Sequence, residues 1–208
     1  MGRDPYAADP AEHEPPEAPD GPLFPGGRVS LDPRPRREDA HKPSEVALVF
    51  AYGSNMQPKQ MEQRCPGARA VGIARLLHHR LDFVGWSSSW GGGVATVTPH
   101  LETETLPPRP EDVGAVDGVL WRLAPGGLDR LDACEGHPHV YRRETACVTL
   151  AAGSVLAWLY RHQRPSLCEP SGAYVNALRT GAREFGLPTG PIAKAASRAR
   201  KLEGLRMR

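Results

Sequence analysis

The turn Tyr52-Gly53-Ser54-Asn55 has residues that could hold an anionic group. It follows a short apolar run, Val46 to Tyr52, that is typical of a buried strand. Gly53 lets the backbone approach a ligand, and successive amide groups of Gly53, Ser54 and Asn55 could point into one concavity ahead of the next helix. The alternative is a common strand-to-helix turn in which Ser54 or Asn55 only caps the helix.

A second candidate is Glu135, in the stretch Leu131-Asp132-Ala133-Cys134-Glu135-Gly136-His137. A short helix is expected to end at Gly136, which puts Glu135 in its last turn, where the negative end of the helix dipole disfavours a further negative charge. We therefore expect a raised pKa, which suits a carboxyl group to general acid and base catalysis near neutral pH. The alternative is a solvated surface glutamate.

Cys134 offers a different chemistry, because a thiol beside Glu135 and His137 could act as a nucleophile with its base. Neighbours in sequence at a helix end rarely face one another, so a buried structural thiol is the expectation we favour. The histidines lack the paired carboxylates or cysteines of a convincing metal site, and no metal or cofactor is assigned.

The glycine-rich stretch Ser89 to Thr96, which includes Trp90, has no sequence typical of a phosphate-binding loop. It could place Trp90 or backbone amides near a ligand. A simple hairpin turn explains it equally well.

Strand patterns dominate the part of the chain that must position these residues. Strands are expected at Val46 to Tyr52, Gly72 to Val84 with a break at the two histidines, Val94 to Thr98, Ala115 to Leu123, Tyr141 to Leu150 and Ser154 to Tyr160. Helices are expected at Gln57 to Arg64, Gly127 to Ala133 and Gly172 to Phe185, the last being the longest candidate. Strands in succession with tight junctions favour a closed or strongly curved, mainly antiparallel sheet over a parallel one.

The two ends differ from this middle part in composition. Residues 1–45 contain ten prolines, ten acidic residues and six basic residues, which predicts a disordered leader. Residues 189–208 carry six Lys or Arg against one acid, with apolar residues at roughly helical spacing, which predicts a basic and possibly helical tail. A folded domain is thus expected over 46–188.

Composition also limits the partners and the compartment. The chain has 26 Lys and Arg against 24 Asp and Glu, so no strong basic field favours nucleic acid or an anionic membrane, and a small molecule or a protein is the expected partner. The four cysteines form no C-x-x-C pair, and neither a signal peptide nor a membrane span is indicated. A reducing cytoplasm is the expected location. The oligomeric state cannot be predicted.

Several motifs occur together in a fixed order along about 140 residues. They are FAYGSN at 50–55, LDF at 81–83, SWGGGVAT at 89–96, GVLW at 118–121, LDACEG at 131–136 with Tyr141 after it, and Tyr174 followed by GAREFGLP at 181–188. As an ordered set they resemble the γ-glutamylcyclotransferase family, in the broad group that includes AIG2-like and BtrG-like proteins.

This resemblance implies a small α+β domain on a curved, barrel-like sheet with a few short helices. It implies that the protein is a metal-independent enzyme that cyclises a γ-glutamyl amide or γ-glutamyl amino acid to 5-oxoproline and releases the free amine. Glu135 matches the catalytic acid/base position, the loop of Tyr52, Gly53, Ser54 and Asn55 would bind the γ-glutamyl group, and Tyr141 and Tyr174 match pocket tyrosines.

Two other functions stay open at this stage. One is a BtrG-like removal of a γ-glutamyl group from an acyl intermediate in secondary metabolism, and the other is a non-catalytic binding module on the same fold. The leader, the basic tail and His137-Pro138-His139 depart from the family pattern. They leave the leaving group, including whether it comes from glutathione, undetermined.

Overall fold

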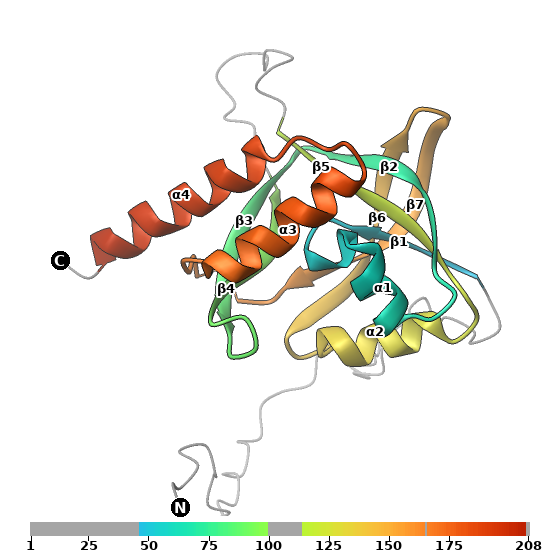
Figure 1. Ribbon diagram of the computed structural model, residues 1–208, viewed down its shortest axis with the longest axis horizontal. Helices are drawn as coiled ribbons and strands as arrows, with labels where there is room; N and C mark the ends of the chain where they lie inside the picture. Colours follow the sequence, from blue (N-terminus) through green and yellow to red (C-terminus); the bar gives the residue numbers. More distant parts are fainter. Residues whose placement is uncertain (1–45, 100–113, 165, 207–208) are drawn as a thin grey trace, which may run out of the picture. The chain divides into compact units, whose positions relative to one another are not determined.

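The computed structural model describes residues 46–99, 114–164 and 166–206, and the predicted leader lies outside these ranges (Figure 1). The strands are β1 (Ala47–Ala51), β2 (Arg69–Leu77), β3 (His79–Ser87), β4 (Gly92–Pro99), β5 (Ala115–Leu123), β6 (Tyr141–Leu150) and β7 (Gly153–His162). The helices are the short 3-10 helix η2 (Ser54–Met56), α1 (Pro58–Arg64), α2 (Gly127–Glu135), α3 (Gly172–Glu184) and α4 (Gly190–Arg206).

Five strands close into a barrel in the order β1-β5-β2-β6-β7. All neighbouring pairs are antiparallel except β1 and β7, which run parallel where Val49 faces Trp158. Strands β3 and β4 form a separate two-stranded sheet. The expectation of an α+β fold on a curved, mainly antiparallel and barrel-like sheet is therefore confirmed.

The predicted break at the two histidines is the point where the chain leaves the barrel. His78 lies between β2 and β3 and has a φ of 56°, in the left-handed region that ends regular strand geometry. The following strand, β3, pairs with β4 and not with β2. The change of direction at His78 thus separates the barrel from the hairpin.

Strand β1 lies in the core and leads directly to the candidate turn. Val49, Phe50 and Ala51 are buried, and Val49 and Phe50 pair with Trp121 and Leu120 of β5. A strand that has neighbours on both sides and is covered on both faces typically has a continuous apolar sequence, as β1 does. The turn that follows β1 is therefore anchored by a rigid, buried strand.

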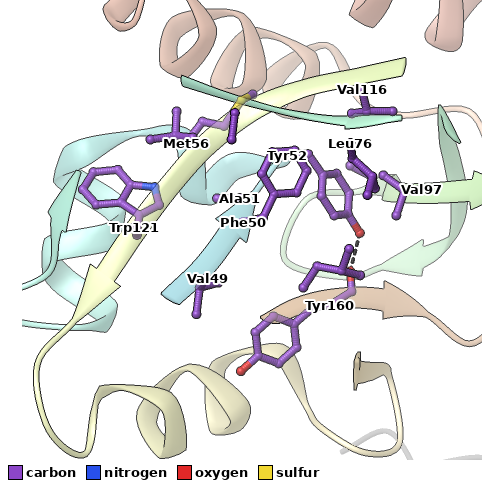
Figure 2. Packing of buried hydrophobic residues seen from close by; sticks show 14 of the residues in the cluster. Val49, Phe50, Ala51, Tyr52, Met56, Leu76, Val97, Val116, Trp121 and Tyr160 are labelled. Carbon is purple, nitrogen blue, oxygen red and sulfur yellow. Dashed lines mark hydrogen bonds between the residues drawn. The ribbon is translucent and has the colours of Figure 1, made fainter. Parts of the chain in front are cut away.

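The aromatic residue at the end of this strand is also held in the core. Figure 2 shows the ring of Tyr52 among Leu76, Val97 and Val116, with its hydroxyl group directed at the backbone of Tyr160. Tyr52 is 6% exposed, so the tyrosine that begins the candidate turn is a core residue with one polar end.

The C-terminal helices pack on the hairpin sheet and on each other. In Figure 1, α3 and α4 lie beside β3 and β4, and α4 buries Ile192, Ala195 and Ala199. The helix predicted over Gly172 to Phe185 is present as α3, and α4, in the predicted basic tail, is longer, with 17 residues against 13. Two of the buried residues of α4 are alanines set among lysines and arginines, so its buried face gives only a weak apolar pattern in the sequence. No helix in the described ranges is both long enough and apolar enough to cross a membrane.

Candidate active site

The turn of Tyr52 to Asn55 carries the chain from β1 into η2 and then α1. The amides of Met56 and Gln57 close it by donating to the carbonyl oxygens of Gly53 and Ser54 at 3.0 and 3.1 Å. The amides of Gly53, Ser54 and Asn55 take no part in this closure, because the first amides of a helical turn have no intrahelical acceptor. A Cβ atom added at Gly53 would lie 3.5 Å from the hydroxyl oxygen of Tyr174.

Glu135 is the last residue of α2, as predicted. The helix ends at Gly136, whose φ of 63° is the left-handed conformation typical of a glycine C-cap. The Oε1 atom of Glu135 accepts hydrogen bonds from Nδ2 of Asn55 and from a guanidinium nitrogen of Arg64, both at 2.8 Å. Helix α2 therefore brings the carboxyl group directly to the turn after β1.

Burial raises the pKa of the Glu135 carboxyl group, and the Arg64 charge and the hydrogen bonds from Asn55 and Arg64 oppose this rise. This is the direction expected from the sequence, and burial is its largest cause, whereas the sequence argument relied on the helix dipole. The side chain of Glu135 is 12% exposed, which excludes the alternative of a solvated surface glutamate.

Helix α1 supplies two further polar side chains on one face. Gln60 and Arg64 are four residues apart, so they point to the same side of the helix. Gln60 Nε2 donates to Ser54 Oγ at 2.6 Å and to Asn55 Oδ1 at 3.1 Å, and Arg64 donates to the same Asn55 oxygen at 2.8 Å. These contacts fix the side-chain amide of Asn55 so that its nitrogen donates to Glu135.

Three tyrosines complete the surroundings of the turn. The Tyr141 hydroxyl donates to the carbonyl oxygen of Ala95 at 2.8 Å, and the Ala95 amide donates to the Tyr174 hydroxyl at 3.1 Å. The Tyr52 hydroxyl donates to the carbonyl oxygen of Tyr160 (Figure 2). Burial raises the pKa of all three hydroxyls above the usual range, so they stay protonated at neutral pH.

All seven residues singled out from the sequence line one narrow cavity, which we call the inner cavity. They are Tyr52, Gly53, Ser54, Asn55, Glu135, Tyr141 and Tyr174. A larger space of about 370 Å³, the outer cavity, adjoins it and shares Ser54, Glu135, Tyr141 and Tyr174 with it. The fold thus gathers residues that are up to 122 positions apart in the chain.

The thiol beside Glu135 is placed differently from the expectation. Cys134 is exposed and not a buried structural residue, and it is one of the residues that line the outer cavity. His137 accepts a hydrogen bond at Nδ1 from the backbone amide of Arg143 at 3.1 Å. Among the residues that the structure describes, no group of three His, Cys, Asp or Glu is arranged to hold a metal ion.

The profile of one protein family, "Gamma-glutamyl cyclotransferase, AIG2-like", matches residues 49–176. The chain belongs to this family. A γ-glutamylcyclotransferase from Bos taurus is 31% identical over 150 residues, which are 69% of this chain and 74% of that protein. The γ-glutamylcyclotransferase from Homo sapiens is 30% identical over 158 residues, covering 73% and 78% of the two chains.

Solved structures agree with this family membership. A structure described as a γ-glutamyl cyclotransferase aligns with a TM-score of 0.63 and 29% identity, over 73% of this chain and 86% of that one. The relatives are named for an enzymatic activity, and the chain is therefore a member of an enzyme family of the γ-glutamylcyclotransferase type.

Two polar residues that contact the turn beside the inner cavity were not predicted from the sequence. Gln60 and Arg64 carry no motif of their own, and a polar helix face is most often only solvated. Their spacing of four residues, in a helix that begins three positions after Asn55, was the available signal. It indicates side chains that can reach back to the turn.

Proposed function

We propose that the protein cyclises a γ-glutamyl amide or γ-glutamyl amino acid to 5-oxoproline and releases the free amine. Glu135 is the general acid and base in this proposal, and the loop of Tyr52 to Asn55 holds the γ-glutamyl group. The observation that carries it is the hydrogen bond of 2.8 Å between Asn55 and Glu135, which joins the predicted binding loop to the predicted catalytic group.

The reaction needs no nucleophile from the protein, because the α-amine of the substrate attacks its own γ-carbonyl carbon. One C–N bond forms within the five-membered ring and the original amide C–N bond breaks. Glu135 accepts a proton from the attacking nitrogen and delivers one to the leaving nitrogen, so that no proton and no water is consumed overall. A folded substrate gains reactivity because amine and carbonyl are held together at high effective concentration.

The position of Glu135 suits this proton transfer. Both of its hydrogen bonds go to Oε1, and Oε2 has no hydrogen-bond partner in the described part of the chain. A carboxyl group with a raised pKa takes up and returns a proton more readily near neutral pH than an ordinary glutamate does. Oε2 is the oxygen that we assign to the transfer.

The loop and the tyrosines have a binding role in the proposal. The amides of Gly53, Ser54 and Asn55, which are not used to close the turn, would hold the substrate α-carboxylate or the developing oxyanion. Tyr141 and Tyr174 are held by hydrogen bonds to the backbone of Ala95 and line the same cavity as the loop. Tyr52 holds the loop to the core through Tyr160.

The four free cysteines support the cytoplasmic location that we propose with this activity, since a reducing compartment keeps thiols unpaired. We also propose residues 46–188 as the cyclotransferase domain, flanked by a leader and a basic tail.

The substitution Glu135→Gln tests the proposal. It keeps the shape and the acceptor oxygen but removes the proton transfer, so 5-oxoproline release from a γ-glutamyl amide should fall about a hundredfold or more. The matched control is Glu184→Gln, on the exposed end of α3, which should keep full activity. Unchanged 5-oxoproline release by Glu135→Gln would show that the assignment of this residue is wrong.

A further inference from the structure

The outer cavity lies where the leaving half of a γ-glutamyl amide has to go. It shares Glu135 with the inner cavity, and Glu135 is the group that returns the proton to the leaving nitrogen in the proposed function. Most of its remaining lining comes from the β3–β4 hairpin and from the end of α2 with the segment that follows it, and Arg64 of α1 and His162 of β7 complete it. In the proposed function these residues would face the departing amine and not the γ-glutamyl half.

The wall of the outer cavity is aromatic and apolar on the hairpin side. Trp86 is 68% exposed, which is a large apolar surface to leave in water. Trp90 packs on Tyr174 with 4.9 Å between ring centroids, and Val140, from the segment after α2, is 49% exposed. These apolar groups line the same cavity as Glu135.

The position of Trp86 is fixed by a β-bulge. Strand β3 has one extra residue relative to β4 between Val84 and Ser87, and bulges turn side chains toward sites beside a sheet. Gly85 makes this possible with a φ of 61°, and the ring of His162 fills the space where a Cβ atom at Gly85 would lie. The backbone conformation of the bulge therefore sets the position of the exposed Trp86 side chain.

The charges of the outer cavity are already balanced. Among its described lining residues, Arg64 and Glu135 are the charged side chains, and they pair with each other at 2.8 Å. Burial lowers the pKa of His162, so this imidazole is neutral at pH 7. A leaving group with its own carboxylate would meet no cation in this lining other than the one that Glu135 already binds.

We propose that the outer cavity binds the leaving amine and selects an amine whose substituent is uncharged and either aromatic or extended and apolar. Trp86 provides this selectivity. The inference rests on the proposed function, since it assigns the leaving half of the same substrate. The hydroxyl groups of Ser87, Ser88 and Ser89 at the rim of this cavity can serve neutral polar groups on such an amine.

A panel of four substrates separates the two parts of the proposal. γ-Glutamyl phenethylamide and γ-glutamyl ethylamide differ by a phenyl group, and γ-glutamylphenylalanine and γ-glutamylalanine add a carboxylate to each of these. We expect kcat/KM for 5-oxoproline release to be about tenfold higher for the phenethylamide than for the ethylamide. It should also exceed that for γ-glutamylphenylalanine by about tenfold.

The substitution Trp86→Ala identifies the residue responsible. It should reduce the preference for the phenethylamide over the ethylamide to about twofold or less, mainly through a lower kcat/KM for the phenethylamide, because the small amine does not reach the indole. Leu156→Ala is the matched control. Leu156 is 71% exposed on β7 and lies outside both cavities, so this substitution should leave the preference unchanged.

The outcomes distinguish this inference from the proposed function. If none of the four substrates yields 5-oxoproline, the proposed function itself fails. If kcat/KM is equal for the ethylamide and the phenethylamide, or if Trp86→Ala lowers both values by the same factor, the selective outer cavity is contradicted while the cyclisation stands. A preference for γ-glutamylphenylalanine over the phenethylamide would contradict the selection of a leaving amine whose substituent is uncharged.

Discussion

Glu135 is subject to two opposing influences that together set its pKa. Burial disfavours the carboxylate, and the guanidinium group of Arg64 at 2.8 Å favours it. Asn55 connects the two residues, because it donates to Glu135 and accepts from Arg64. The carboxyl group is therefore held in one orientation, and the Arg64 charge limits the rise of its pKa. In the proposed function this group first accepts and then donates a proton.

The pH dependence of activity should report this balance. In Arg64→Met the positive charge is lost, the pKa of Glu135 rises further, and the acidic limb of the kcat/KM profile should move to higher pH. Activity is then lost at acid pH and recovers as the pH is raised, because Glu135 must be ionised to accept the first proton. The measurement is 5-oxoproline release from γ-glutamyl ethylamide as a function of pH.

The conservative variant Arg64→Lys is the control for this prediction. It keeps the charge but not the fork of nitrogens, so its acidic limb should lie between those of the wild type and Arg64→Met. An acidic limb at the same pH in all three proteins would mean that Arg64 does not set the ionisation of the catalytic group.

At the residue scale, the sequence predicted the chemically distinctive positions and missed the supporting ones. Glu135 could be proposed because Gly136 marks a helix end and LDACEG stands in an ordered set of motifs that is specific as a whole. Gln60 and Arg64 could not, because their roles depend on the direction in which α1 leaves the turn. Cys134 was expected to be buried and is exposed, since the preference of cysteine for the core does not say which face of a short helix is covered.

Helix α2 is tied to the barrel one turn before the end that carries Glu135. The carboxylate of Asp132 accepts a hydrogen bond from the Tyr160 hydroxyl at 2.6 Å and pairs with Arg143. Figure 2 shows the Tyr160 ring extending from β7 toward α2, while its backbone oxygen accepts the hydrogen bond from Tyr52. Tyr160 thus joins the strand that carries the loop to the helix that carries Glu135.

The hairpin that lines the outer cavity depends on glycines with positive φ. Gly85 and Gly91 have φ values of 61° and 67°, but only at Gly85 would a Cβ atom meet a neighbour, the His162 ring at 2.4 Å. Gly91→Ala should therefore lower the free energy of unfolding by about 1 kcal/mol, through backbone strain alone. Gly85→Ala adds the collision and should cost about 2 kcal/mol more.

Urea denaturation of the two variants checks this prediction. Both glycines lie in the same hairpin and have φ values in the left-handed region. The difference between the two losses in the free energy of unfolding therefore isolates the contact with His162. Equal losses in both proteins would show that the ring moves away without cost and that the bulge does not hold Trp86 in place.

At the element scale, every strand was predicted, with bounds that differ by up to three residues, and the partners of the strands could not be predicted. Alternating and apolar runs gave β5 and β6 with the observed bounds, and the two histidines marked the break before β3. No local pattern shows that β3 leaves the barrel to pair with β4, because sheet membership depends on contacts far apart in sequence.

At the scale of the whole molecule, the basic C-terminal segment is packed on the structure that carries the site. Helix α4 contacts β3 and α3, and it buries small residues that give the sequence little hydropathy. The composition of this segment predicted a charged tail because a count of residue types does not separate the exposed face of the helix from its buried face. The strand that α4 covers, β3, is the one whose end carries Trp86.

Two arginines of α4 should differ in their contribution to stability although both make ion pairs of 2.6 Å. Arg198 binds Asp82 of β3, whose side chain is 2% exposed, whereas Arg200 binds Glu169 with both side chains largely in water. Arg198→Met leaves Asp82 buried with Arg80 as its remaining ion-pair partner and should lower the free energy of unfolding by about 2 kcal/mol or more. Arg200→Met should change it by no more than about 0.5 kcal/mol, because solvent and salt screen an exposed pair. Denaturation of both variants measures the difference, and a similar small loss in each would mean that α4 is held by its apolar face alone.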